Sequence, residues 1–121
     1  MKKTVVIGAS PDPSRFSNKA TRRLASLGYE VVLIGKKEGY LDGHPILKIQ
    51  DEPDIKDVHT VTMYINSRNQ YDWYEYILGL SPNRIIFNPG SENIELSDMA
   101  RNKGIEVEFA CSLIMLNTGI Y

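Results

Sequence analysis

Two stretches of the sequence carry residues of the kind that hold phosphate groups. In the first, the apolar segment Thr4–Ile7 runs into a loop that begins Gly8-Ala9-Ser10 and is stiffened by Pro13. Backbone amides after such a strand, together with the dipole of the helix that follows, attract anions, and Gly8 lets the backbone approach a ligand closely. Arg15 and Ser17 crowd the expected helix start, where a guanidinium opposes the dipole unless it serves an anion. The loop therefore predicts a phosphate site, with a plain strand–helix connection as the alternative.

The second stretch is an apolar segment, Val31–Gly35, that ends at Lys36 and Lys37. In dinucleotide-binding α/β domains, the end of the second strand usually carries a carboxylate that contacts the ribose of NAD. Two lysines suit a phosphate on the ribose instead, because hydrogen bonds to charged groups are worth about 1.5–3 kcal/mol. The pattern favours a ligand with an extra phosphate near its ribose over NAD, and a solvated turn is the alternative.

Polar residues also follow two apolar segments later in the chain. Asn66 comes after the segment 60–65, and Asn88-Pro89-Gly90 follows the segment 84–87. We expect Asn88 to hydrogen-bond a ligand amide or a base edge. The alternative is a turn selected for the geometry of proline and glycine.

The elements that must position these loops alternate between strand-like and helix-like segments along the whole chain, which indicates a parallel sheet with covering helices. Loops at the carboxyl ends of such strands meet in one crevice. We expect an α/β fold with a doubly wound, mostly parallel open sheet of five to six strands and helices on both faces. The expected strands cover residues 4–8, 30–34, 46–49, 60–65, 84–87 and 105–109.

The first helix is expected to begin between Ser14 and Ser17, either of which could cap it, and to end at Gly28. Apolar residues at helical spacing are expected to face the sheet: Phe16, Ala20, Leu24 and Leu27.

Later helices also carry capping signals. The residues from Ser67 to Gln70 match a capping box, in which the Gln70 side chain returns to the Ser67 amide. Ser91 or Asn93 is expected to cap the following helix. A terminal helix or an extended tail is expected over Ser112–Tyr121.

The composition is that of a soluble globular protein. The 121 residues, with 42% hydrophobic and 24% charged residues and a net charge of −1, fit one domain over residues 1–121 that folds without disulfides or metal. Near-neutral charge argues against general nucleic-acid binding. No apolar run is long enough for a signal peptide or membrane span. One cysteine excludes an internal disulfide and favours a reducing cytoplasm.

Other chemistries find little support in the sequence. His44 and His59 have no cysteine or carboxylate at metal-ligand spacing, and neither has a triad partner, so we expect no zinc site and no hydrolytic triad. Cys111 is interpreted as a buried, inert thiol; the alternative is a thiol close enough to a thiol-bearing ligand to form a mixed disulfide. The aromatic residues of segment 71–76 suggest a homodimer face, and ordinary packing against the sheet is an equal alternative.

Four stretches together resemble the small stand-alone CoA-binding proteins, a Rossmann-like group related in fold to the CoA-binding domain of the succinyl-CoA synthetase α subunit. These stretches are Val6–Ser17, Leu27–Val31, Leu41–Ile46 and Asn88–Asn93. The resemblance spans nearly the whole chain, and it implies a Rossmann-like fold with CoA as the ligand.

The resemblance also implies where CoA lies. Its diphosphate is expected against residues of the first loop: Gly8, Ala9, Ser10, Arg15 and Ser17. Lys37 matches a lysine that the family often places after its second strand, whereas Gly35-Lys36 stands where members usually have Asn-Pro. Asn88 stands where many members carry glutamine, and Gly90 matches their glycine.

The sequence thus predicts a protein that binds CoA or an acyl-CoA at the carboxyl edge of its sheet. A non-catalytic binding, sensing or regulatory module is favoured, because no substrate domain and no cluster of acid, base and nucleophile is visible. Two alternatives stay open. One is an NADP-dependent oxidoreductase, since Lys36 and Lys37 also suit a 2′-phosphate. The other is an interaction protein whose nucleotide site has decayed.

Overall fold

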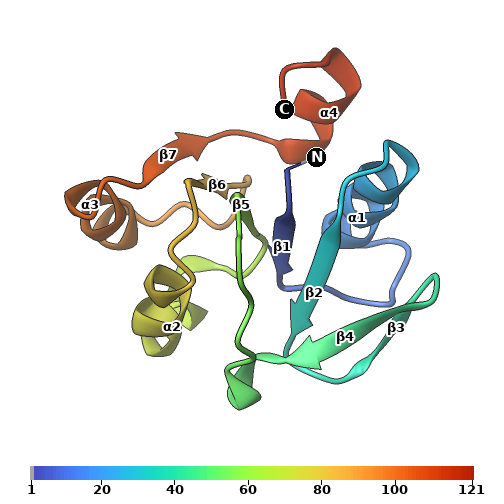
Figure 1. Ribbon diagram of the computed structural model, residues 1–121, viewed down its shortest axis with the longest axis horizontal. Helices are drawn as coiled ribbons and strands as arrows, with labels where there is room; N and C mark the ends of the chain where they lie inside the picture. Colours follow the sequence, from blue (N-terminus) through green and yellow to red (C-terminus); the bar gives the residue numbers. More distant parts are fainter. Residues whose placement is uncertain (1) are drawn as a thin grey trace.

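The computed structural model describes residues 2–121, which form a seven-stranded sheet with helices on both faces (Figure 1). The strand order is β3-β4-β2-β1-β5-β6-β7, and every neighbouring pair is parallel except β3 and β4. The strands are β1 (Thr4–Ile7), β2 (Val31–Gly35), β3 (Gly39–Leu41), β4 (His44–Lys48), β5 (Thr60–Met63), β6 (Arg84–Phe87) and β7 (Glu106–Phe109). The expected α/β, mostly parallel sheet is confirmed.

The expected count of five to six strands is wrong, because part of the segment 38–54 forms a hairpin. β3 and β4 pair in an antiparallel manner, with Tyr40 opposite Pro45. Asp42 and Gly43 connect them with φ angles of 48° and 85°. Asp-Gly is a strong signal for such a two-residue turn, because both positions need positive φ. The hairpin adds an antiparallel edge beyond β2.

Four α-helices cover the sheet, two on each face. They are α1 (Phe16–Ser26), α2 (Tyr74–Gly79), α3 (Ile94–Asn102) and α4 (Ser112–Thr118). Side chains alternate across each strand, so the Val5 side of the sheet packs on α2 and α3, and the Val6 side packs on α1 and α4. Figure 1 shows the two helix pairs on opposite sides of the sheet. Within residues 2–121, no helix has the length and apolar character needed to cross a membrane.

α1 begins at Phe16, between Ser14 and Ser17 as expected, but the expected cap is wrong. Neither Ser14 nor Ser17 caps it, because the cap position is Arg15, which makes no side-chain capping bond. The Asp12 carboxylate instead accepts hydrogen bonds from the backbone N–H and the hydroxyl of Ser14, at 3.0 and 2.8 Å, and shapes the preceding turn. Both bonds lower the pKa of Asp12, and the bond from the Ser14 backbone has the larger effect.

The part of α1 that contacts the sheet is shorter than the row of apolar residues predicts. Ala20 and Leu24 are fully buried, as expected. Phe16 is 65% exposed and Leu27 is 39% exposed, because they lie at the two ends of the helix, beyond the area that the sheet covers. Phe16 is free to contribute to the surface at the carboxyl edge of the sheet.

The expected capping box at Ser67 is also wrong. Gln70 is fully buried, and its amide donates to the carbonyl oxygens of Ile65 and Ser91 at 2.8 and 2.7 Å. The Asn66 side chain accepts from the Asn69 amide instead, at 3.2 Å. Short 3₁₀ turns occupy Ser67–Asn69 and Tyr71–Trp73, and α2 begins only at Tyr74.

Two other expectations concern this half of the fold. Asn93 caps α3 as expected, since its side chain accepts from the Leu96 amide at 2.9 Å. Of the aromatic segment, Tyr74 is buried, and Trp73 and Tyr76 pack against the core, whereas Tyr71 is 69% exposed. Packing against the sheet accounts for most of these rings, and a homodimer stays a prediction.

Candidate functional site

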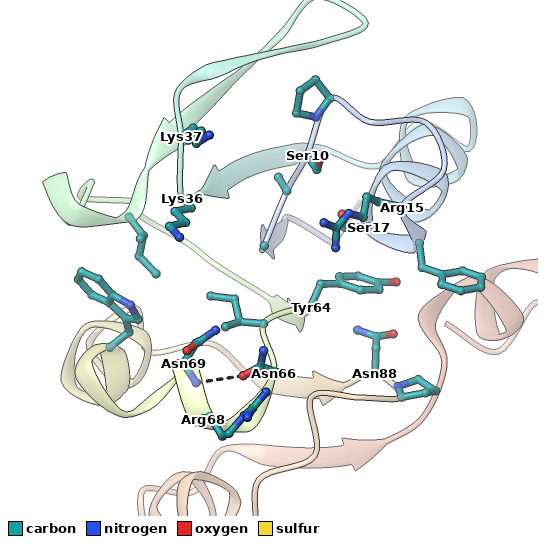
Figure 2. A pocket seen from close by; sticks show the side chains of 18 of the residues that line it. Ser10, Arg15, Ser17, Lys36, Lys37, Tyr64, Asn66, Arg68, Asn69 and Asn88 are labelled. Carbon is teal, nitrogen blue, oxygen red and sulfur yellow. Dashed lines mark hydrogen bonds between the residues drawn. The ribbon is translucent and has the colours of Figure 1, made fainter.

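A cavity of about 1080 Å³ lies at the carboxyl ends of β1, β2, β5 and β6 (Figure 2). The edge of the sheet that the sequence predicts for the site is therefore hollowed. Ten of the twelve residues predicted for the site line this cavity: Gly8, Ala9, Ser10, Arg15, Ser17, Lys36, Lys37, Asn66, Asn88 and Pro89.

The other two predicted residues, Pro13 and Gly90, do not line the cavity. Pro13 is exposed in the turn that Asp12 shapes. Gly90 has a φ of 95°, and its N–H donates to the Glu92 carboxylate at 2.8 Å. Both residues serve turn geometry, which is why their proximity to the site in sequence was misleading.

Gly8 is required by the packing of the protein itself. Its φ is 98°, and a Cβ atom there would lie 2.9 Å from the backbone carbonyl carbon of Tyr64. The sequence suggested that the missing side chain makes room for a ligand. The geometry shows that it makes room for the backbone after β5, which brings Tyr64 beside the first loop.

The first loop is held in a fixed shape by hydrogen bonds to its neighbours. The N–H groups of Gly8 and Ala9 both donate to the carbonyl oxygen of Ile34 in β2, at 2.9 and 3.0 Å. From α1, the buried side chain of Asn18 donates to the carbonyl oxygen of Ser10 at 2.9 Å. These bonds fix the shape of the loop.

Three backbone N–H groups of this loop and helix start have no hydrogen-bond acceptor within residues 2–121. They belong to Ser10, Phe16 and Ser17, which all line the cavity. The last two are the first amides of α1, where the helix dipole favours negative charge. The Arg15 side chain lies beside them and forms no ion pair with the described residues. The arrangement suits a phosphate group.

Positive charge dominates the cavity wall. Arg15, Lys36, Lys37 and Arg68 line it, against the carboxylates of Glu38 and Asp72. None of these six groups forms an ion pair with another residue of the described chain. A site with unpaired cations is suited to an anionic ligand.

Tyr64 forms part of the cavity wall, between the first loop and Asn88 (Figure 2). Burial raises the pKa of its hydroxyl well above 10.0, with a smaller contribution from the nearby Cys111. The hydroxyl is therefore neutral at physiological pH.

Several cavity residues were not among those predicted. They are Pro11, Ser14, Phe16, Glu38, Ile49, Gln50, Tyr64, Ile65, Arg68, Asn69, Asp72, Trp73, Cys111 and Leu113. Tyr64 to Arg68 directly follow β5. Their position at the carboxyl end of a strand could have identified them as site residues. Ile49 and Trp73 come from 3₁₀ turns that no sequence pattern marked.

Asn88 lines the cavity, but its amide is engaged by the protein. The side chain is 1% exposed and donates to the Thr62 hydroxyl and to the Met63 carbonyl oxygen, at 2.7 and 2.9 Å. Its oxygen accepts from the Ser112 amide at 2.7 Å. Asn88 thus ties β5 and β6 to the start of α4, and both of its donors are unavailable to a ligand.

Cys111 differs from the expected buried thiol, because it is half-exposed and lines the cavity. His44 and His59 lie outside the cavity lining. Within residues 2–121, no three His, Cys, Asp or Glu side chains come together as metal ligands.

An open parallel sheet with a cationic cavity at the carboxyl ends of its central strands is the architecture of Rossmann-like, nucleotide-binding α/β proteins. Sequence comparison makes the class more specific. The chain belongs to the CoA binding domain family, whose family model matches residues 2–117. No match was found among curated proteins.

Solved structures share this fold. An uncharacterised protein is 45% identical with a TM-score of 0.96, over 100% of this chain and 98% of its own. A protein from Thermus thermophilus is 22% identical with a TM-score of 0.82, over 99% of this chain and 90% of its own. A conserved hypothetical protein from Pyrococcus furiosus is 22% identical with a TM-score of 0.75, over 90% of this chain and 93% of its own. The last two show similarity of fold alone.

Proposed function

We propose that this protein binds CoA or an acyl-CoA in the cavity at the carboxyl edge of its sheet. The observation that supports this most strongly is that two anion-binding groups share one cavity. One group consists of Arg15 and the free N–H groups of Ser10, Phe16 and Ser17, and the other consists of Lys36 and Lys37 after β2. CoA carries a diphosphate and a separate 3′-phosphate on its ribose, so it matches both. Family membership supports the same ligand.

The size of the cavity is consistent with such a ligand. Ligand sites commonly have volumes of about 300–1000 Å³, and this one measures about 1080 Å³. The apolar side chains of Ile49, Ile65 and Trp73 offer surface to a base or to an uncharged arm. Each hydrogen bond between a phosphate and a charged group contributes about 1.5–3 kcal/mol, so Arg15, Lys36 and Lys37 are expected to set the affinity for CoA.

The role that we propose is binding, sensing or regulation rather than catalysis. Both histidines lie outside the cavity. Burial raises the pKa of Tyr64, which makes its hydroxyl a poor general base. With its one free cysteine, the protein is suited to a reducing cytoplasm.

Calorimetric titration with CoA, dephospho-CoA, NADP and NAD tests the proposal. We expect CoA to bind most tightly, dephospho-CoA to bind more weakly because it lacks the 3′-phosphate, and NAD to give no measurable heat of binding. Saturable binding of NADP alone would support the oxidoreductase alternative. No binding of any of the four would indicate a decayed nucleotide site.

A further inference from the structure

Two arginines have no ion pair and no side-chain hydrogen bond within residues 2–121, and both line the cavity. They are Arg15 and Arg68. The other arginines are engaged elsewhere: Arg22 with Asp42, Arg84 with Glu108, Arg101 with Asp98 and Arg23 with Asn117. Arg15 is accounted for by the proposed diphosphate site, which leaves Arg68 without a partner.

Arg68 lies on the wall opposite the phosphate-binding groups. Figure 2 shows Arg68 and Asn66 on one side of the cavity and Ser10 and Lys37 on the other, with Tyr64 between them. A ligand that places its phosphates at the first loop and at β2 therefore reaches Arg68 only with its far end.

The segment that carries Arg68 is anchored to the sheet. Asn66 accepts from the Asn69 amide at 3.2 Å, and the buried Gln70 side chain donates to the carbonyl oxygens of Ile65 and Ser91. Asp72 also lines the cavity but does not come within 4.0 Å of the Arg68 guanidinium. The backbone that carries Arg68 is thus held in place, and the charge of the exposed guanidinium is available to a ligand.

From this placement we infer that Arg68 binds a carboxylate at the acyl end of the ligand, an inference that rests on the proposed CoA binding. The phosphates of CoA account for Arg15 and the two lysines, and the pantetheine arm carries no charge. A cation on the far wall is therefore matched by an acyl group that ends in a carboxylate. A guanidinium binds a carboxylate through two parallel hydrogen bonds. The preferred ligand is then a dicarboxylic acyl thioester of CoA.

The test uses calorimetry on the full chain to compare acyl-CoA pairs that differ only in the terminal group, a carboxylate in one member and a methyl group in the other. The pairs are malonyl-CoA against propionyl-CoA and glutaryl-CoA against valeryl-CoA. We expect at least one acidic member to bind about tenfold more tightly than its neutral partner. A tenfold ratio of affinities corresponds to about 1.4 kcal/mol, and a hydrogen bond between charged groups contributes at least as much.

Variants separate Arg68 from the rest of the cavity. Arg68→Gln should abolish the preference and weaken the acidic acyl-CoA far more than CoA itself, and Arg68→Lys should retain part of the preference. Arg101→Gln, which alters an arginine outside the cavity, should preserve it fully. Thermal unfolding is measured for each variant to check that its fold is intact.

Two results would overturn the inference while leaving CoA binding in place. One is equal affinity of the wild type for the acidic and neutral members of both pairs. The other is a loss in Arg68→Gln that is the same for CoA and for every acyl-CoA, since Arg68 would then serve the phosphates. If CoA itself does not bind, the proposed function fails and the inference fails with it.

Discussion

A Cβ atom on Gly35 would lie 2.6 Å from the carbonyl oxygen of Ala9. Real Cβ atoms essentially never approach another atom so closely, so the end of β2 fits against the first loop only because residue 35 has no side chain. Lys36 and Lys37 follow directly, and Ser10 follows Ala9. This close approach sets the spacing between the two proposed anion-binding groups.

Gly35→Ala should therefore damage stability and ligand binding together. Forcing an extra carbon into a packed site typically costs about 1–3 kcal/mol, and displacement of the first loop should weaken CoA. Urea denaturation and calorimetry measure the two effects. Gly39→Ala is the matched control, since its Cβ would meet only the Ile46 side chain, at 3.8 Å. Equal losses in the two variants would contradict a special role for Gly35.

Asn88→Ala should lower the free energy of unfolding by about 3 kcal/mol, because three buried hydrogen bonds of about 1 kcal/mol each are lost. Chemical denaturation measures this loss. Asn102→Ala, which removes an exposed asparagine from the end of α3, should change stability by less than about 0.5 kcal/mol. A stable Asn88→Ala variant that only loses affinity for CoA would show that Asn88 serves the ligand instead.

The stability of the protein should depend on the protonation of His59. Burial lowers the pKa of His59 below 6.5, and the positive charges of Arg84 and Lys2 lower it further. The unfolded chain then binds a proton more readily than the folded protein does. This contribution to stability is complete above pH 6.5 and is lost as the pH falls through the lower pKa of the folded state.

Urea midpoints measured between pH 5 and pH 8 check this dependence. We expect His59→Gln to show a shallower fall in stability at acid pH than the wild type. His44→Gln, which removes the other histidine, should keep the wild-type slope. Identical slopes for the wild type and His59→Gln would rule out His59 as the titrating group.

Cys111 should be alkylated by iodoacetamide in the free protein and protected by bound acetyl-CoA, whose own thiol is blocked, because Cys111 is half-exposed and lines the cavity. It is the one cysteine of the chain, so mass spectrometry reports its modification without ambiguity. NAD at the same concentration serves as the control and should leave the rate unchanged. An unchanged alkylation rate at saturating acetyl-CoA would place the ligand away from Cys111.

Much of the fold could be predicted because the central strands are buried on both faces and appear in the sequence as apolar, β-branched runs. A strand near β4 was expected over 46–49, but β3 and its antiparallel pairing with β4 were missed because β3 is short and β4 contains Pro45, although Asp42-Gly43 marked the turn. The exposure of Phe16 depends on where the sheet ends beneath α1, which helical periodicity does not encode.

The part of the site that strand topology determines could be predicted from the sequence. Parallel strands bring their carboxyl ends to one edge, so the residues after β1, β2, β5 and β6 converge there whatever the details of their loops. Arg68 and Trp73 were missed because the buried side chain of Gln70 fixes their turns by tertiary hydrogen bonds. Asn88 was assigned to a ligand because its partners, Thr62 and Ser112, are distant in sequence.

The most direct test of the account measures whether the charge at Lys37 and the 3′-phosphate of the ligand interact. Calorimetry measures the affinity of the wild type and of Lys37→Glu for CoA and for dephospho-CoA. Lys103→Glu, which alters an exposed lysine outside the cavity, is the control. We predict that Lys37→Glu weakens CoA about tenfold and dephospho-CoA less than about twofold. Equal losses for the two ligands would contradict the account, because the ribose phosphate would then lie elsewhere.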